Sequence, residues 1–157
     1  MNVLNIKPSV RLATMEDLED LLSLGRELHE ENGLLNLDED IIRQGALDAI
    51  AGRNSTVGVI GPVGRIEAAI HLAFRKFWYT SDWHLEELWA YVRPEYRKST
   101  RAKSLVQYAK HCSDTLQVPL LIGILSNHRT EAKVALYRRQ LGDPTGAYFL
   151  YNAKTVT

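Results

Sequence analysis

Positive charge gathers in one stretch of a chain whose net charge is zero, VRPEYRKSTRA at residues 92–102 and the lysine after it. An apolar run precedes this stretch and helical spacing begins at Ser99, so the N–H groups of residues 98–103 are expected at a helix N-terminus. Such an end binds anions. Basic side chains there oppose the helix dipole, which favours a ligand with several negative charges, such as a pyrophosphate with a further phosphate. A plain basic surface turn is the alternative. The basic residues are Arg93, Arg97, Lys98, Arg101 and Lys103.

The elements that would position this stretch show both strand and helix periodicity. Residues 85–124 predict a strand, a helix and a strand, with the strands parallel and joined by a right-handed crossover. The run PLLIGILS, residues 119–126, is typical of a strand buried on both faces. The strands in the rest of the chain are predicted to form an antiparallel meander. Strands are expected at 10–13, 55–61, 66–74, 84–92, 119–126 and 147–151, and helices from Thr14, over 38–51, from Ser99 and over 130–141.

The composition limits the class of protein. A length of 157 residues predicts a single domain, 1–157. No run of 18 apolar residues occurs, so no membrane partner is expected, and the N-terminus has no signal-peptide pattern. The single cysteine, Cys112, fits a reducing compartment and predicts a cytoplasmic location. Zero net charge and a strongly acidic segment, 14–48, argue against a nucleic-acid partner.

Residues 92–105 resemble a known binding motif, the coenzyme A pyrophosphate motif of the GCN5-related N-acetyltransferases, the GNAT superfamily. Val92, Pro94 and Arg97 match its first positions and Ala102 its last. At the position of the first motif glycine, the chain has Thr100. This form of the motif resembles that of GNAT-like proteins in phage and prophage genomes. A β-carbon at that position would crowd the pyrophosphate.

The resemblance extends over nearly the whole chain, because the order of the elements from Val10 to Tyr151 is similar to that of the family. The segment ALYRRQLG also resembles the family's last helix, with Tyr137 at the tyrosine position. The implied fold class is α/β (α+β), the GNAT fold. Its sheet is mixed and mostly antiparallel, with one parallel pair joined by a helix and with helices on both faces.

The resemblance implies direct transfer of an acetyl group from acetyl-CoA to a primary amine of a small molecule or a protein. Tyr137 would protonate the leaving thiolate, and Glu86, eleven residues before Arg97, would be the base. Glu87 is the alternative base. Strand parity places it with Trp89, on the face opposite Glu86, unless a bulge shifts the parity. Backbone N–H groups near residues 91 and 92 would polarise the thioester. The implied CoA-binding residues are Tyr91, Val92, Arg97, Lys98, Ser99, Thr100, Arg101, Ala102, Lys103 and Asn127.

The sequence supports one alternative function and several further predictions. A GNAT-fold module that binds CoA or a protein without catalysis is the alternative function. The acidic segment 14–48 favours a cationic acceptor. The five histidines have no ligand-like spacing, which predicts no metal site. Gly58, Gly61 and Gly64 lack the Lys-Ser/Thr of a P-loop and are interpreted as turn residues. Aromatic residues at 77–91 predict core packing or a subunit interface, which would make a homodimer.

Overall fold

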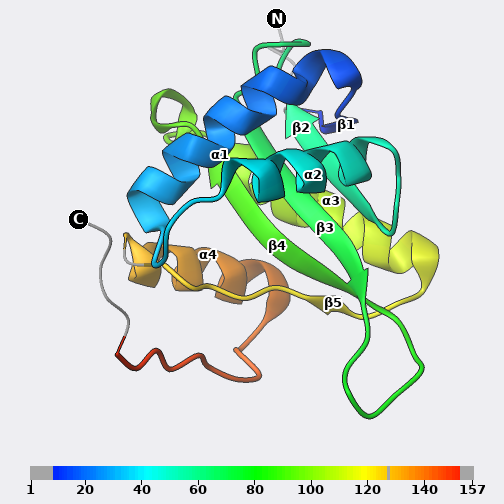
Figure 1. The fold of residues 1–157 in the computed structure, drawn as a ribbon. Helices are drawn as coiled ribbons and strands as arrows, with labels where there is room; N and C mark the ends of the chain where they lie inside the picture. The colour runs from blue at the N-terminus through cyan, green and yellow to red at the C-terminus, as the bar shows by residue number, and fades with distance from the viewer. Residues whose placement is uncertain (1–8, 127, 153–157) are drawn as a thin grey trace, which may run out of the picture.

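The computed structural model of the protein describes residues 9–126 and 128–152. These residues form one mixed sheet with helices packed on both faces (Figure 1). The strands are β1 (Arg11–Leu12), β2 (Ser55–Ile60), β3 (Ala68–Arg75), β4 (His84–Val92) and β5 (Leu120–Leu121). The helices are α1 (Leu18–Asn32), α2 (Glu39–Ile50), α3 (Arg101–Leu116) and α4 (Thr130–Leu141), with 3-10 turns η1 (Met15–Asp17) and η2 (Pro94–Tyr96).

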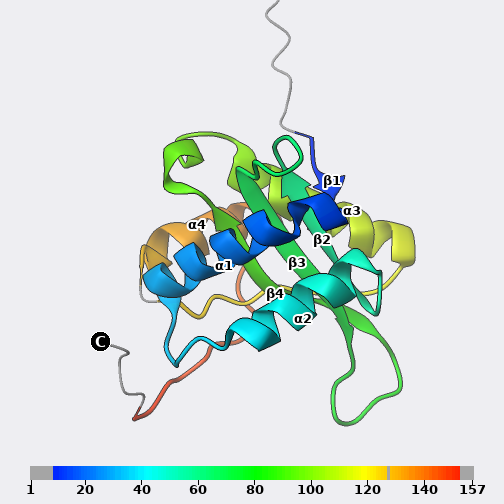
Figure 2. The same cartoon turned by 45° about the horizontal axis from the view of Figure 1, so that its top comes forward.

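The strands follow chain order across the sheet, β1-β2-β3-β4-β5. Strands β1 to β4 are antiparallel neighbours, whereas β4 and β5 are parallel. Helix α3 joins this parallel pair, as the sequence predicts. Helices α1 and α2 lie together on one face of the sheet, and α3 lies on the other (Figure 2). The predicted fold class is confirmed.

Apolar side chains fill both sides of the sheet. Beneath α1 and α2, one cluster includes Leu24, Val59 and Tyr91. Beneath α3, the second cluster includes Leu72 and Leu105. Burying each large side chain of this kind contributes about 1.5–3 kcal/mol. Two cores therefore hold β3 and β4 from both faces, which fixes the strand that carries the two candidate glutamates.

The first helix begins where the sequence predicts it. Thr14 and Asp17 form a capping box, in which the Asp17 carboxylate accepts from the Thr14 N–H at 2.8 Å. The same carboxylate accepts two hydrogen bonds from the Arg11 guanidinium and one from the Gly64 N–H at 3.0 Å. One buried acid therefore ties the start of α1 to β1 and to the β2–β3 turn.

The three glycines differ in role. Gly61 and Gly64 lie in the β2–β3 turn with φ of +117° and +74°, a conformation that favours glycine. Gly58 lies inside β2, so its interpretation as a turn residue is wrong. A β-carbon at position 58 would lie 2.6 Å from the Tyr108 ring of α3. Glycine is needed there because a helix packs directly on the strand.

Two predicted strands differ from the structure. The ladder of β5 ends at Leu121, so the expected strand over 119–126 is wrong beyond that residue, and both β5 residues are half-buried. Residues 147–151 form no strand. Phe149 and Tyr151 are 95% and 94% exposed. A strand needs a partner whose N–H and C=O groups are within reach, and among the described residues none pairs with 147–151.

A helix that crosses a membrane must be both long and apolar. Within the described ranges, no helix is both long enough and apolar enough to cross a bilayer.

Candidate active site

The sheet opens between its two parallel strands. Strand β4 pairs with β5 only at Leu85 and Glu86, opposite Leu120 and Leu121. Beyond these pairs the ladder stops, and a cavity of about 940 Å³ is lined by residues 86–92 on one side and by residues 123–126 on the other. Its remaining walls come mainly from α1, α2, α3 and α4, with smaller parts from β2, β3 and the connecting segments. The cavity therefore reaches both faces of the sheet through the gap between the strands.

A β-bulge at Leu88 decides which way the two glutamates point. Leu72 of β3 pairs with Glu87 and the preceding His71 pairs with Trp89, so β4 has one extra residue. Leu72 belongs to the core beneath α3, which places Glu87 on that face. Trp89 packs on the core beneath α1 and α2. The parity that grouped Glu87 with Trp89 is therefore wrong, and the bulge is the reason.

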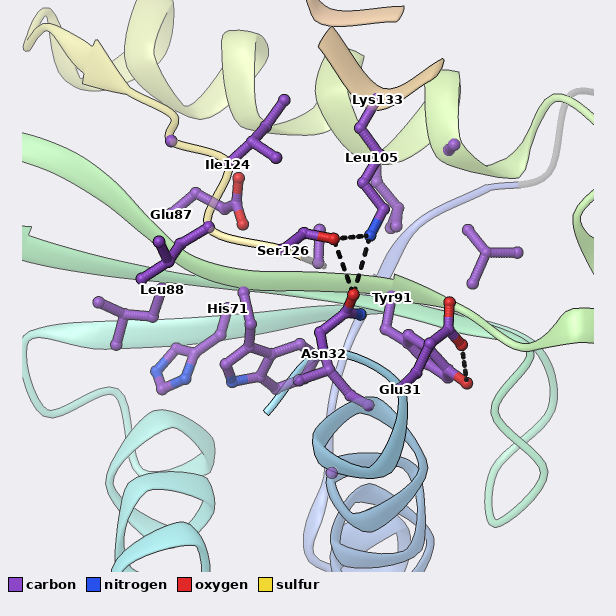
Figure 3. Close-up of a pocket in the computed structure, with 18 of the residues that line it drawn as sticks. Glu31, Asn32, His71, Glu87, Leu88, Tyr91, Leu105, Ile124, Ser126 and Lys133 are labelled. Atoms are coloured by element: carbon purple, nitrogen blue, oxygen red, sulfur yellow. Dashed lines mark hydrogen bonds between the residues drawn. The ribbon is translucent and has the colours of Figure 1, made fainter. Parts of the chain in front are cut away.

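Figure 3 shows this division across the strand. Glu87 lies on the side of α3 and Lys133, and His71 lies on the side of α1 and α2. Glu86, one residue before Glu87, pairs with Ala73 and lies on the same face as His71. Both carboxylates line the cavity, from opposite faces of the sheet.

The hydroxyl of Tyr137 from α4 lies close enough to the Glu87 carboxylate for each group to influence the pKa of the other. Its Oε2 atom is buried and has no hydrogen-bond partner among the described residues. Burial raises the pKa of Glu87 to about 7, although Tyr137 and the charge of Lys133 oppose the rise. Burial and the neighbouring carboxylate raise the pKa of Tyr137 well above its ordinary value. Two groups that can hold a proton near neutral pH are thus in contact inside the cavity.

Glu86 has a wetter environment than Glu87. Its side chain is 31% exposed, and its Oε2 lies 3.7 Å from His84 Nε2. His84 is buried and stacks on Phe77 with ring centroids 4.3 Å apart. A partly hydrated carboxylate beside an imidazole can take a proton and pass it to solvent.

Three polar residues from separate elements meet at the opening. Ser126 donates to Asn32 Oδ1 at 2.8 Å, and Lys133 donates to Ser126 Oγ at 2.8 Å and to Asn32 Oδ1 at 3.3 Å (Figure 3). Burial lowers the pKa of Lys133. Sequence reasoning missed this cluster, because no spacing along the chain relates the end of α1 to α4.

The arginines of the basic stretch are paired with acids. Arg93 binds Asp20 and Glu27 of α1, with N–O distances of 3.0 and 2.7 Å. Arg101 binds Glu67 at 2.7 Å. Part of the positive charge at 92–103 therefore neutralises acids that lie against it in the fold, which the sequence reading did not foresee.

Arg97 is held more tightly than the other two. It donates to Glu31 Oε2 at 2.5 Å and, through Nε, to the Val92 carbonyl at 2.9 Å. Tyr91 also donates to Glu31, at 3.2 Å. Burial is the largest single effect on Glu31 and favours its protonated form. The bond and charge of Arg97, with smaller contributions from His128 and Tyr91, together hold the pKa of Glu31 below its ordinary value. The charges of Lys98 and Lys103, by contrast, are exposed.

The start of α3 offers open backbone donors. Arg101 N–H donates weakly to Ser99 Oγ at 3.3 Å, and no acidic residue occupies the first turn. Within the described residues, no acceptor is found for the N–H groups of residues 98–100, 102 and 103. Thr100 has φ −89°, so this backbone does not require the motif glycine. The geometry suits an anion at the helix N-terminus.

One backbone donor also faces the opening. Arg93 N–H bonds to Glu67 O at 3.0 Å, toward the β3 side of β4. Successive residues of a strand point to opposite edges, so Val92 N–H faces the open edge and Tyr91 N–H does not. Of the two donors expected to polarise a carbonyl, only Val92 is aimed at the cavity side.

Some of the predicted site residues line the cavity and others do not. Among the lining residues are Glu86, Tyr91, Val92, Arg97, Ser99, Ala102 and Tyr137, whereas Lys98, Thr100, Arg101 and Lys103 are outside the lining set. Asn127 lies outside the described residues. In the ranges that the structure covers, no three His, Cys, Asp or Glu side chains are grouped to hold a metal ion.

No family model matches the sequence, and no curated protein is similar to it at the level of sequence. The fold, however, matches solved structures over nearly its whole length. It is similar to AAC(6')-Iy in complex with the bisubstrate analog CoA-S-monomethyl-acetylneamine, with a TM-score of 0.73, 13% identity, and 93% and 97% of the two chains covered. The chain has the GNAT acetyltransferase fold.

Two further GNAT-fold structures resemble the chain equally well. A possible acetyltransferase from Clostridium difficile 630 has a TM-score of 0.71 and 20% identity, and the match covers 95% of this chain and 98% of that one. A predicted acetyltransferase with acetyl-CoA from Clostridium acetobutylicum has a TM-score of 0.71 and 17% identity, covering 92% and 95%. The GNAT resemblance of the sequence is confirmed at the level of fold, and the phage variant stays a prediction.

Proposed function

We propose that the protein is an acetyl-CoA-dependent N-acetyltransferase that transfers the acetyl group directly to a primary amine. The observation that carries this proposal is the placement of the two glutamates. One bulge turns Glu86 toward the α1–α2 face and Glu87 toward Tyr137, and both line one cavity. A site that removes a proton on one side and supplies one on the other needs such a division.

The residues around the opening fit a coenzyme A thioester. The open N–H groups at the start of α3, with Lys98 and Lys103, would hold the pyrophosphate, and the gap between β4 and β5 would take the pantetheine arm. Arg97 would position the loop through Val92 and Glu31. Acetyl-CoA supplies the acetyl group as a thioester.

The protein's own groups would carry the protons. Glu86 takes a proton from the acceptor ammonium and passes it to solvent, and Val92 N–H donates to the carbonyl that is attacked. A C–N bond forms and the C–S bond breaks. Tyr137 Oη donates a proton to the departing sulfur, and Glu87, when neutral, replaces it. The ammonium loses two protons, which Glu86 takes in succession and passes to solvent, and the sulfur gains one from Tyr137. Solvent then returns a proton to Glu87, so one net proton is released in each turnover.

A non-catalytic CoA-binding or interaction module remains the second candidate, and one observation favours it. Arg93, Arg97 and Arg101 are all bound to carboxylates, so fewer free cations face an incoming pyrophosphate than the sequence implies.

Thiol release from acetyl-CoA in the presence of a panel of amines, with mass spectrometry of the products, tests the proposal. We expect an N-acetylated product and stoichiometric free CoA. Glu86→Gln should lower turnover by roughly 10²–10⁴-fold, the range for loss of a positioned base. Calorimetric binding of acetyl-CoA without any acetylated product would favour the non-catalytic module.

A further inference from the structure

The half of the cavity that faces α1 and α2 has apolar walls. It is lined by Leu28, Leu37, Ile41, Ile42, Ala46 and Trp89. Several apolar side chains of the cavity lining are solvent-exposed: Ile41 is 70% exposed, Leu88 40%, Leu125 54% and Tyr148 63%. Large apolar groups left in water around one cavity indicate a ligand that covers them.

Most acidic side chains of segment 14–48 form ion pairs and do not point into the cavity. Seven of the eleven acidic residues in 14–48 are paired with arginines: Asp17, Glu19, Asp20, Glu27, Glu31, Glu39 and Asp48. Only Glu31 of the eleven lines the cavity, and Arg97 and Tyr91 already bond to it. Within the cavity lining, the segment therefore offers no uncompensated carboxylate to a second or third ammonium of a ligand.

The two histidines of this half have different surroundings. Burial, with a smaller effect from Arg75, lowers the pKa of His71 to about 4, so its ring is neutral at pH 7. His29 is bound through Nε2 to the Leu35 carbonyl at 2.6 Å. Glu86 is thus the one free carboxylate of the described lining on this face, and it lies on β4 beside the opening.

There is unfilled space opposite β4. Gly45 of α2 lines the cavity, and a β-carbon built on it would meet no atom within 4 Å. Gly25 of α1 lines it too, with Ile42 Cδ1 3.6 Å from its built β-carbon. The open space on this half therefore lies at Gly45, whereas a β-carbon at Gly25 would be in ordinary contact with α2.

From these walls, charges and space, we infer that the acceptor is a monoamine on an apolar aliphatic or aromatic body. The body occupies the space between Gly45, Ile41 and Trp89, and the nitrogen faces Glu86. This inference rests on the proposed acetyl transfer. It narrows the cationic acceptor that the acidic segment 14–48 favoured to an amine with a single positive charge. A second charge on the body would lie against apolar walls without a partner, which is costly.

Two amines with the same number of heavy atoms test the inference, pentylamine and 1,4-diaminobutane. We expect kcat/KM for pentylamine to exceed that for the diamine by at least about 10-fold, because only the diamine brings a second charge. From butylamine to hexylamine, kcat/KM should rise roughly fourfold per methylene, the ratio that corresponds to about 0.8 kcal/mol. Equal or better use of the diamine overturns the inference and leaves acetyl transfer standing.

A substitution in α2 supplies an independent test. Gly45→Leu should fill the α1–α2 half and raise KM for pentylamine by at least about 10-fold, with acetyl-CoA affinity retained in calorimetry. Gln44→Leu adds the same side chain at an exposed position of α2 outside the lining and serves as the matched control. An unchanged KM in Gly45→Leu would overturn the placement of the body.

Binding without turnover separates this inference from the catalytic proposal. Trp89 is the tryptophan of the described lining, so its indole N–H signal reports amine binding by chemical shift. Pentylamine should shift it at lower concentration than 1,4-diaminobutane does, even if no acetyl group is transferred. Tighter binding of the diamine, or no shift with pentylamine, overturns the inference. Failure of acetyl-CoA to bind would instead count against the proposed function.

Discussion

Glu86 and Glu87 are adjacent in sequence but differ in every property that matters for proton transfer. Glu86 is partly hydrated beside His84, whereas Glu87 has its Oε2 atom buried beside Tyr137. Burial disfavours a carboxylate, so Glu87 holds its proton to a higher pH than an exposed glutamate does. We assign Glu86 to the acceptor side and Glu87 to the leaving-group side on this contrast.

At the residue scale, the first prediction concerns Tyr137. Tyr137→Phe keeps the ring and removes the proton donor, so turnover should fall by roughly 10²–10⁴-fold. The KM for acetyl-CoA should change much less, because the hydroxyl acts when charge builds on sulfur. Stability should change by no more than about 1 kcal/mol, since only one hydroxyl is removed.

The matched control for this variant is Tyr108→Phe. Tyr108 is a half-buried tyrosine of α3 that lies outside the cavity lining. Its hydroxyl should be dispensable for turnover. Near wild-type turnover in Tyr137→Phe would remove Tyr137 from the catalytic role and leave water as the proton source.

The second prediction is the pH dependence of kcat at saturating amine. Burial raises the pKa of Glu87 to about 7, and the neutral form is the one that can return a proton to Tyr137. We therefore expect kcat to fall as the pH rises through about 7. Glu87→Gln, whose amide can still donate to Tyr137, should flatten this limb of the profile. The opposite result would be a wild-type kcat that rises through pH 7, together with loss of turnover in Glu87→Gln. That result would identify Glu87 as the general base and contradict its role on the leaving-group side.

At the scale of elements, the bulge in β4 and the short ladder of β5 act together. Two pairs hold the parallel strands at one end, and the extra residue Leu88 re-aims the rest of β4. The opening follows from this interrupted pairing. The start of α3, which follows β4 after the short turn η2, then presents its N–H groups beside that opening.

A third prediction belongs to the start of α3. Lys103 is an exposed cation in the first turn, where the helix dipole disfavours it by about 0.3–1 kcal/mol. Lys103→Glu should therefore leave the melting temperature unchanged or slightly raised, while acetyl-CoA affinity in calorimetry falls about tenfold through charge repulsion. Lys110→Glu, farther along α3, is the control and should leave the affinity unchanged. Equal affinities of the two variants would remove the pyrophosphate from this end of the helix.

At the scale of the whole molecule, ion pairs join segments that are distant in sequence. Arg93 and Arg97 connect the segment after β4 to α1, and Arg101 connects α3 to Glu67 before β3. The aromatic residues near β4 differ in exposure. Trp89 and Tyr91 pack on the core beneath α1 and α2, whereas Trp78 of the β3–β4 loop is 96% exposed. The predicted homodimer stays a prediction.

The fourth prediction concerns Asp17, which has no solvent exposure and is paired with Arg11. Asp17→Asn leaves that arginine without its charge partner and should cost about 3–5 kcal/mol of unfolding free energy at pH 7. Hydrogen bonds from Arg11, opposed by burial, hold the pKa of Asp17 well below its ordinary value. Its contribution is therefore present above the unfolded pKa and lost as the pH falls below about 4.

Urea unfolding at pH 7 and at pH 3 measures both effects. The difference between wild type and Asp17→Asn should be large at pH 7 and smaller at pH 3. Glu16→Gln, a neutralised acid at the exposed neighbouring position, is the control and should change stability by less than about 0.5 kcal/mol. A difference that stays constant with pH would contradict the charged role of Asp17.

Local sequence patterns determined most of the elements of this protein. The Thr14–Asp17 cap, the helical spacing after Ser99 and the change from strand to helix periods predicted α1, α3 and the parallel strand pair. These features depend on neighbours within a few residues, so they can be read from the chain alone. The basic stretch at the start of α3 was visible for the same reason.

Only the tertiary structure decided how the candidate site is arranged. The bulge at Leu88 set the faces of Glu86 and Glu87, and packing between α1 and β4 gave Arg93 and Arg97 their acidic partners. Residues 147–151 have a strand-like sequence but no partner among the described residues. Strand register, ion pairs and ladders all join residues far apart in the chain. Their energies depend on a second segment, which no local pattern specifies.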